Sequence, residues 1–205
     1  MNQYPRLLAL FLLALLPWGA ALAHPHGTMQ CSLSVSFEAG RPALLSGRLL
    51  MDAAHSKEMQ AMLRDPASGL VDALRQQRFM FSLKMQLARS NWLLGAQSGD
   101  LLAQLSPAGE PVLVLADDGR VGVDVALRIE PANAPPDAPP DAAHATWQFF
   151  CADPTYYWVT EFAKPSAPLA VTGCPAPVQS TPVAVATGPR AGSVLVEMRC
   201  ARLAS

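Results

Sequence analysis

The stretch MQCSLSVSF, residues 29–37, decides the fold class of the chain. Its apolar residues Cys31, Leu33, Val35 and Phe37 alternate with serines at the positions between them. A period of two places successive side chains on opposite faces of an extended backbone. The pattern therefore predicts a strand with one face buried and one face exposed to solvent.

The residues that follow predict a hairpin and then two helices. Residues 38–42, EAGRP, are rich in turn-forming types, and Ala43–Met51 is expected to return as a second strand. Asp52 is expected to cap a helix that continues through His55, Glu58, Met59 and Met62. Asp65-Pro66 predicts the start of a second helix with Leu70, Val71 and Leu74 on one face.

The remainder of the chain is dominated by expected strands. They lie at Phe79–Leu87, Val112–Leu115, Val121–Ile129, Thr146–Cys151, Tyr156–Phe162 and Ser193–Cys200. Residues 131–141 contain five prolines and are expected to form a loop within one domain. We therefore expect an α+β fold: a mostly antiparallel, sandwich-like β domain with a short two-helix insertion.

The first 23 residues have the features of a secretory signal peptide. A short start with Arg6 precedes the apolar run Leu7–Leu16, and Ala21 and Ala23 match an A-x-A cleavage site. Ten apolar residues are too few to span about 30 Å of hydrocarbon as a helix. We expect cleavage after Ala23 and a single periplasmic domain, residues 24–205, without stable membrane insertion.

The charges of the chain argue against nucleic-acid binding. The formal net charge is −1, and 15% of the 205 residues are charged. Duplex binding requires a basic face, and recognition of anionic lipid requires a polybasic patch. The overall balance predicts neither of these.

All four cysteines follow the expected leader, at positions 31, 151, 174 and 200. An even number in an exported protein indicates two disulfides, and the long spacings argue against a zinc-thiolate cluster. Three pairings are open from the sequence. We favour Cys174–Cys200, because the proline-rich run between them looks like a connection that closes on a final strand, and this leaves Cys31–Cys151.

Two of the four histidines, His24 and His26, open the expected mature chain. A histidine at position one offers its α-amine and its imidazole as a chelating pair, and His26 adds a third nitrogen. These donors suit zinc, nickel and copper rather than calcium or magnesium. The alternative is a polar terminus whose histidines have no role.

Further candidate ligands lie later in the chain. Asp52 and His55 are three residues apart at the expected helix start, so they share a face. They are either second-tier metal ligands or a capping Asp beside an exposed His. His144 follows the proline-rich loop and is either a further ligand or a solvated side chain.

No catalytic motif is present in the sequence. Nucleophile elbows, paired helical histidines, phosphate loops and dinucleotide fingerprints are all lacking. Asp153 and Glu161 are the acids close to the aromatic run Tyr156–Trp158, which is typical of core and strand surface. We expect a protein that is not an enzyme.

Two landmarks carry a family resemblance: His24-Pro25-His26 and the run Asp153–Tyr157, DPTYY. With them the chain resembles the domain-of-unknown-function family 1007, exported proteins described as periplasmic components of transport systems. Asp52 and Ser56 match the family's D-x-x-x-S helix start, and Gly173-Cys174 resembles its closing G-C.

The chain also departs from this family. Residues 66–89 lack the acidic, calcium-loop-like run of many members, Gly27 replaces the usual larger residue after H-P-H, and His55 stands where an aromatic residue is common. The resemblance implies a periplasmic partner of a nickel/cobalt-type inner-membrane permease that handles zinc or nickel. His24, His26, Asp52 and His55 are the expected metal residues, with copper as a third possible metal.

Two other functions stay open from the sequence. The first is a secreted copper protein or oxidative enzyme that uses the N-terminal histidine chelate. The second is a metal-free interaction protein of the cell envelope.

Overall fold

The computed structural model describes residues 27–99, 101–130, 146–155, 157–185 and 192–201. The expected leader, His24, His26, the proline-rich residues 131–141 and His144 lie outside these ranges. The helical elements are α2 (Ala53–Leu63), α3 (Ala73–Arg89) and the 3-10 turn η1 (Asn91–Leu93). The first seven strands are β1 (Gly27–Glu38), β2 (Arg41–Met51), β3 (Leu94–Ser98), β4 (Leu101–Leu102), β5 (Gln104–Pro107), β6 (Val112–Leu115) and β7 (Val121–Glu130). The remaining strands are β8 (Trp147–Cys151), β9 (Trp158–Phe162), β10 (Leu169–Thr172), β11 (Ala176–Gln179), β12 (Val183–Val185) and β13 (Ser193–Ala201).

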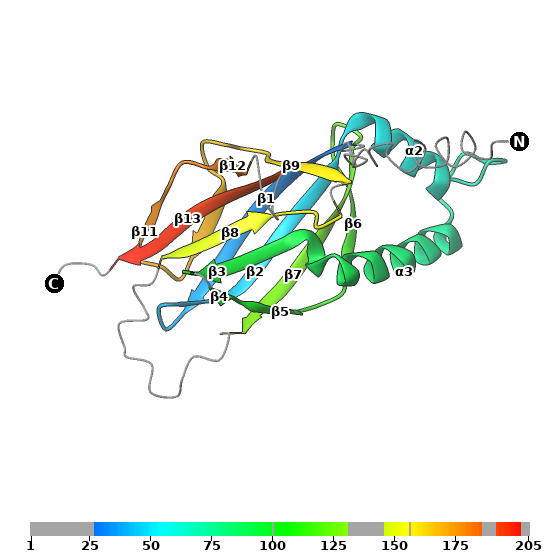
Figure 1. Cartoon of the computed structure of the whole chain (residues 1–205). Coiled ribbons are helices and arrows are strands. Elements are labelled where there is room, and N and C mark those ends of the chain that lie inside the picture. The colour runs from blue at the N-terminus through cyan, green and yellow to red at the C-terminus, as the bar shows by residue number, and fades with distance from the viewer. Residues whose placement is uncertain (1–26, 100, 131–145, 156, 186–191, 202–205) are drawn as a thin grey trace, which may run out of the picture.

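The strands form two sheets that pack face to face (Figure 1). The seven-stranded sheet has the order β10-β1-β2-β7-β5, with β6 also on β7 and β9 also on β1. The six-stranded sheet has the order β11-β13-β8-β3-β4, with β12 on β13. All the pairings are antiparallel except those of β1 with β9 and β10, which are parallel. The expected α+β architecture is thus confirmed.

The core lies between the two sheets. The alternating residues Cys31, Leu33, Val35 and Phe37 are all buried, as the sequence predicts. They pack with apolar residues from β2, β7, β8 and β13 into one cluster. The period-two pattern of β1 therefore supplies one wall of the hydrophobic core.

The two disulfides are Cys31–Cys151 and Cys174–Cys200, the pairing that the sequence favours. Cys31 lies on β1 and Cys151 on β8, so this bridge joins the two sheets through the centre of the core. Both of its cysteines are fully buried. Cys174–Cys200 instead joins the end of β13 to the segment just before β11.

The helical insertion differs from its expected form. Helix α3 begins at Ala73 with Asp72 as its N-cap, and Asp65 forms a turn in which it accepts hydrogen bonds from the backbone of Ala67 and Ser68. The predicted helix start at Asp65-Pro66 is therefore wrong. The predicted strand at Phe79–Leu87 is also wrong, because these residues continue α3 to Arg89.

The strand prediction at Phe79–Leu87 is wrong because the sequence of this segment fits both the strand period and the helical period. Residues 79, 81, 83, 85 and 87 are apolar and, apart from Met80, alternate with polar residues, but Leu83 and Leu87 also lie one helical turn apart. Its methionines, leucines, glutamine and lysine favour a helix. The helix continues from a capped start, so the helical period prevails.

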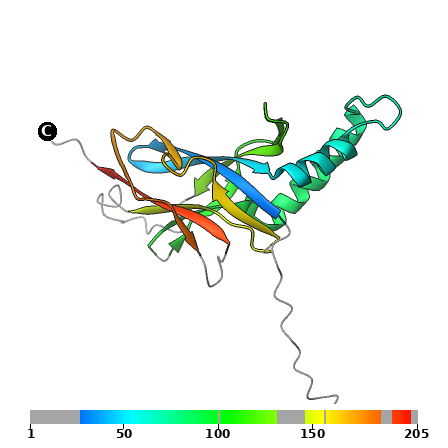
Figure 2. The ribbon, with the colours of Figure 1, turned by 90° about the horizontal axis from the view of Figure 1, so that it is seen from above.

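In Figures 1 and 2, α2 and α3 form an arm that projects from one end of the sandwich. Among the described residues, no helix is long and apolar enough to cross a membrane.

Candidate functional site

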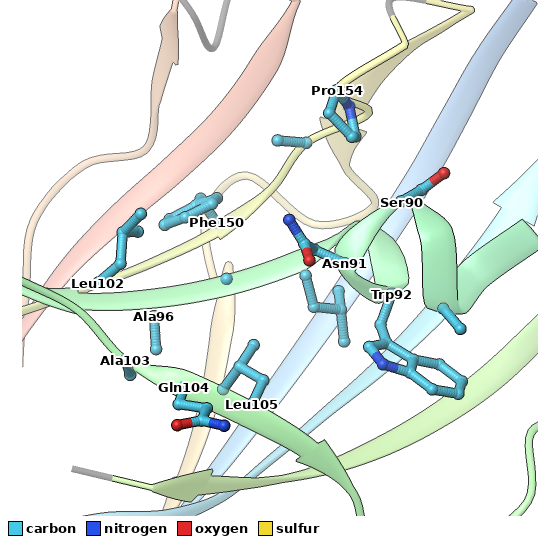
Figure 3. Close-up of a pocket in the computed structure, with 14 residues that line it drawn as sticks. Ser90, Asn91, Trp92, Ala96, Leu102, Ala103, Gln104, Leu105, Phe150 and Pro154 are labelled. Carbon is cyan, nitrogen blue, oxygen red and sulfur yellow. The ribbon is translucent and has the colours of Figure 1, made fainter. Parts of the chain in front are cut away.

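A pocket of about 440 Å³ lies where the end of α3 meets β3, β5 and β8 (Figure 3). Its polar side chains are Ser90, Asn91 and Gln104, and its apolar wall includes Leu105 and Phe150. None of its lining residues is a histidine, a cysteine or a charged residue. This pocket therefore offers no strong ligand for a metal ion, and the candidate residues lie elsewhere.

Asp52 lies directly after β2 and caps helix α2. Its carboxylate accepts hydrogen bonds from the backbone N–H of His55 at 2.9 Å and from that of Thr28 at 3.0 Å. The backbone N–H of Asp52 in turn donates to the carbonyl of Thr28 at 3.0 Å. The start of β1 and the start of α2 are therefore fixed to one another by a single residue.

The ring of His55 turns back onto the same carboxylate. Nδ1 lies 3.0 Å from Oδ1 and 2.9 Å from Oδ2 of Asp52. Because an ionised carboxylate only accepts hydrogen bonds, Nδ1 carries a proton here. When the imidazole is neutral, its lone pair is then on Nε2, which is the atom left for solvent or a ligand.

The electrostatics of the pair favour an ionised Asp52. Burial by itself raises the pKa of the Asp52 carboxyl, but the hydrogen bonds from the His55 and Thr28 backbone and from the His55 ring lower that pKa to about 2. The side chains of His55 and Asp52 are 21% and 29% exposed. The pair is thus a charged, partly buried acceptor site that solvent reaches.

Two aromatic rings lie beside this pair. The His55 ring meets Trp158 edge-on, with 4.7 Å between the ring centroids, and Tyr157 at 6.2 Å. His55 is consequently held on one side by a carboxylate and on another by an indole.

Asp153 positions these aromatic residues. It is only 6% exposed and accepts hydrogen bonds from the backbone N–H groups of Thr155, Tyr157 and Trp158. The buried carboxylate of Asp153 therefore organises an exposed turn that places Trp158 beside His55. Glu161 is an exposed acceptor for Gln30.

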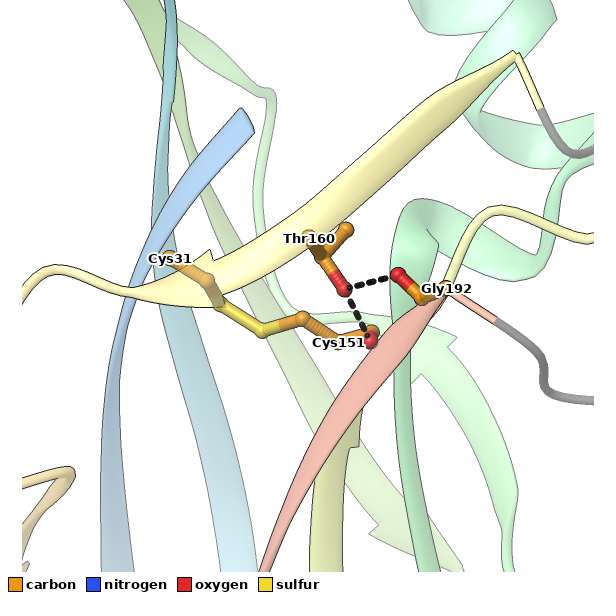
Figure 4. The surroundings of a disulfide bond; sticks show 4 residues. All are labelled: Cys31, Cys151, Thr160 and Gly192. Atoms are coloured by element: carbon orange, nitrogen blue, oxygen red, sulfur yellow. Dashed lines mark hydrogen bonds between the residues drawn. A yellow bond between two sulfur atoms is a disulfide. The ribbon is translucent and has the colours of Figure 1, made fainter. Parts of the chain in front are cut away.

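Strand β9, which carries Trp158, is anchored beside the central disulfide (Figure 4). The buried hydroxyl of Thr160 lies 2.7 Å from the carbonyl oxygen of Cys151 and 3.3 Å from that of Gly192, so its single proton is shared between two acceptors. The backbone N–H of Thr160 donates to Gly192 at 2.8 Å. These bonds hold β9 across the gap between the two sheets.

A further anchor fixes α2 itself. Ser56 is 2% exposed, donates from Oγ to the carbonyl of Met51 at 3.2 Å and accepts from the backbone N–H of Val121 at 3.0 Å. The D-x-x-x-S spacing thus has a structural basis: Asp52 caps the helix and Ser56 ties it to β7.

The described chain begins at Gly27, which packs directly on the pair. A Cβ atom at this position would lie 2.5 Å from Cζ3 of Trp158, 2.6 Å from Cε1 of His55 and 2.9 Å from Oδ2 of Asp52. A larger residue would force at least one of these three side chains to move. This contact is a structural reason for the small residue after His26.

The structure therefore brings Asp52 and His55 together, while His24 and His26 lie outside the described residues. Within the described ranges, no cluster of three or more His, Cys, Asp or Glu side chains forms a metal site. Sequence reasoning missed Gly27 and Trp158 as members of the site. Gly27 was visible as a departure from the family pattern, but the contact of Trp158 with His55 has no sequence signal.

Comparisons with known proteins do not assign the chain to a family. No family model matches the chain, and no curated protein matches it significantly.

Proposed function

We propose that this protein is an exported carrier of a divalent transition metal, zinc or nickel, that serves an inner-membrane metal permease. The observation that carries the proposal is the packing of Gly27 against Asp52 and His55. The H-P-H run is joined to this residue, so two of the four histidines adjoin a third that is already oriented by a carboxylate.

Chain connectivity limits how far these histidines lie from the pair. Consecutive Cα atoms are about 3.8 Å apart, so the backbone of His26 is next to Gly27. His24 is three residues before Gly27, which is at most about 11 Å of extended chain. The length of the connecting chain therefore allows both imidazoles to approach His55.

The donors divide into ligands and a positioning residue. Nε2 of His55, the imidazoles of His24 and His26 and the α-amine of a processed His24 make four nitrogen donors, the number that zinc prefers. Asp52 accepts from Nδ1 of His55, which is the usual second partner of a metal-binding histidine. Its two oxygens already accept hydrogen bonds, so we assign Asp52 to orientation of His55.

The proposed export of the protein and the proposed permease partner are supported by separate observations. The two disulfides fit an oxidising compartment, in agreement with the expected leader. The permease follows from the resemblance to the periplasmic transport family.

The test is calorimetric titration of zinc and of nickel into protein that begins at His24. Replacing His24 and His26 together by Ala is expected to weaken binding at least tenfold, about 1.4 kcal/mol, and His55→Ala is expected to weaken it similarly. His144→Ala is the matched control and should leave the affinity unchanged. Equal affinities in all four proteins, or no binding to the unaltered one, would overturn the proposal.

A second comparison isolates the α-amine. One extra residue before His24 keeps both imidazoles but removes the amine from the chelate ring. Because metal binding requires deprotonated donors, affinity should fall below about pH 6.5 as imidazoles take up protons. The extended protein should bind more weakly and lose the upper part of this pH dependence. If the authentic and the extended protein have equal affinities at both pH 7.5 and pH 6, the amine is not a ligand.

A further inference from the structure

The helical arm has an unusual amount of exposed apolar surface. Only Leu87 among the 17 residues of α3 is buried. The large apolar side chains that are exposed on the arm are Met62, Leu70, Val71, Leu74, Phe81 and Met85, at 47% to 71%. Exposed apolar patches of this kind mark surfaces that bind a partner or a membrane.

Three of these residues form one stripe along α3. Leu74, Phe81 and Met85 are seven and four residues apart, so they lie on the same helical face. Phe81 is the most prominent, with 71% of its surface exposed. Phe81 also borders a hollow of about 420 Å³ that α3 shares with residues 110–113 at the start of β6, so this part of the stripe lies at the junction of the arm and the sandwich.

The charged residues of α3 are all basic. Its sequence contains Arg75, Arg78, Lys84 and Arg89 and no acidic residue. Lys84 donates to Glu110 at 2.6 Å, and Arg75 interacts with Asp65, whereas Arg78 lies on the face of the apolar stripe. Helix α3 is therefore more basic than the near-neutral chain as a whole.

We infer that the arm docks on an anionic phospholipid bilayer. Leu74, Phe81 and Met85 enter the boundary between headgroups and acyl chains, and Arg78, with Arg75 three residues before it, contacts lipid phosphates. A helix that presents an exposed apolar stripe beside cations needs no complementary groove in its partner, because lipid chains adapt to it.

Two further observations favour the bilayer over other occupants. A second copy of α3 would place cations against cations, which opposes self-association. The arm also leaves the sandwich beside Gly27, since Thr28 and Asp52 are hydrogen bonded to each other. The expected leader, which engages the membrane until it is cleaved after Ala23, is therefore joined to the same end of the molecule. This inference does not depend on metal binding.

The experiment is flotation of metal-free protein, residues 24–205, with vesicles of phosphatidylcholine alone or mixed equally with phosphatidylglycerol. We expect binding to the anionic vesicles at least about tenfold stronger than to the neutral ones, and weaker binding at high salt. Leu74→Ser with Phe81→Ser, and separately Arg75→Gln with Arg78→Gln, should each lower binding about tenfold or more.

Matched controls lie at the other end of the sandwich. Val178 and Val183 are 50% and 54% exposed, and Val178→Ser with Val183→Ser should leave vesicle binding unchanged. Arg41→Gln is the control for the arginine variant. Binding that is equal for both vesicles, or unaffected by the arm variants, would overturn the inference. Dimerisation that is lost with the Leu74 and Phe81 changes would also overturn it, since the stripe would then be an interface between copies.

Discussion

Nδ1 of His55 lies 2.9 Å from Oδ2 of Asp52, and the same carboxylate caps the helix on which His55 stands. One charged group therefore fixes the helix start, the first residues of β1 and the orientation of an imidazole. Because these roles share one carboxylate, its protonation should loosen the fold and the candidate site together.

The first prediction concerns the stability of the protein in acid. The pKa of Asp52 is lowered to about 2 in the folded protein, below its usual 3.8, so the unfolded state binds the proton more readily. The stabilisation is present above about pH 4 and is lost as the pH falls toward 2. Allowing for the solvent that reaches the carboxyl, we expect its loss to be about 1–2 kcal/mol.

Urea unfolding at pH 5 and at pH 2.5 measures this effect. The unaltered protein should lose about 1–2 kcal/mol more stability between the two pH values than Asp52→Asn does, because the variant has no carboxyl to protonate at this position. An equal loss in both proteins would mean that Asp52 is not the group responsible.

The second prediction ranks the two disulfides. Cys31 and Cys151 are 120 residues apart, and Cys174 and Cys200 are 26 apart. Loop entropy alone makes removal of the longer bridge more destabilising by about 1 kcal/mol. Replacing Cys31 and Cys151 by Ala also leaves space in the centre of the core, which adds to the loss.

Two double Cys→Ala variants, one for each bridge, allow a direct comparison by urea unfolding. The Cys31 and Cys151 variant should have the lower free energy of unfolding. In the folded protein the buried bridge should also resist reduction by dithiothreitol longer than Cys174–Cys200. A reversed order in both measurements would contradict the central role of the core disulfide.

The third prediction concerns the turn between β1 and β2. Glu38 pairs with Arg41, so the loop has two residues, and both Ala39 and Gly40 have positive φ angles, 49° and 78°. Such a turn favours Asn-Gly, because asparagine adopts this conformation more readily than alanine. Ala39→Asn should therefore stabilise the protein by about 0.5–1 kcal/mol.

Thermal unfolding tests this prediction. The melting temperature should rise for Ala39→Asn and fall for Gly40→Ala, which introduces a second alanine with a positive φ angle. A fall for both variants would show that Ala39 has contacts beyond the turn.

Local patterns predicted much of the fold. The alternation of Cys31 to Phe37, the turn that follows and the cap at Asp52 each depend on residues close together in sequence. The same information misassigned Phe79–Leu87, because its apolar residues satisfy the strand and the helix period. Only the cap at Asp72 and the run of helix-forming residues decide between them.

The candidate site was only partly visible in the sequence. The spacing of Asp52 and His55 shows that they share a helical face, and the structure brings them into contact. The edge-on packing of Trp158 on His55 depends on the parallel pairing of β9 with β1, which joins distant parts of the chain. Such pairing leaves no periodic signal near either residue.

The last prediction concerns Gly27, the residue that joins the H-P-H run to the site. A methyl group here would lie 2.5 Å from Trp158 and 2.6 Å from His55, so one or both rings must move. We expect Gly27→Ala to lower stability by about 1–3 kcal/mol and to weaken zinc binding, because the displaced His55 ring loses its orientation toward Asp52. Gly109→Ala is the matched control, since nothing lies within 4 Å of its added methyl group. Thermal unfolding and zinc titration of both variants distinguish the two roles of the glycine. If Gly27→Ala lowers stability but leaves zinc affinity unchanged, the close packing serves the fold alone, and the metal site does not use His55.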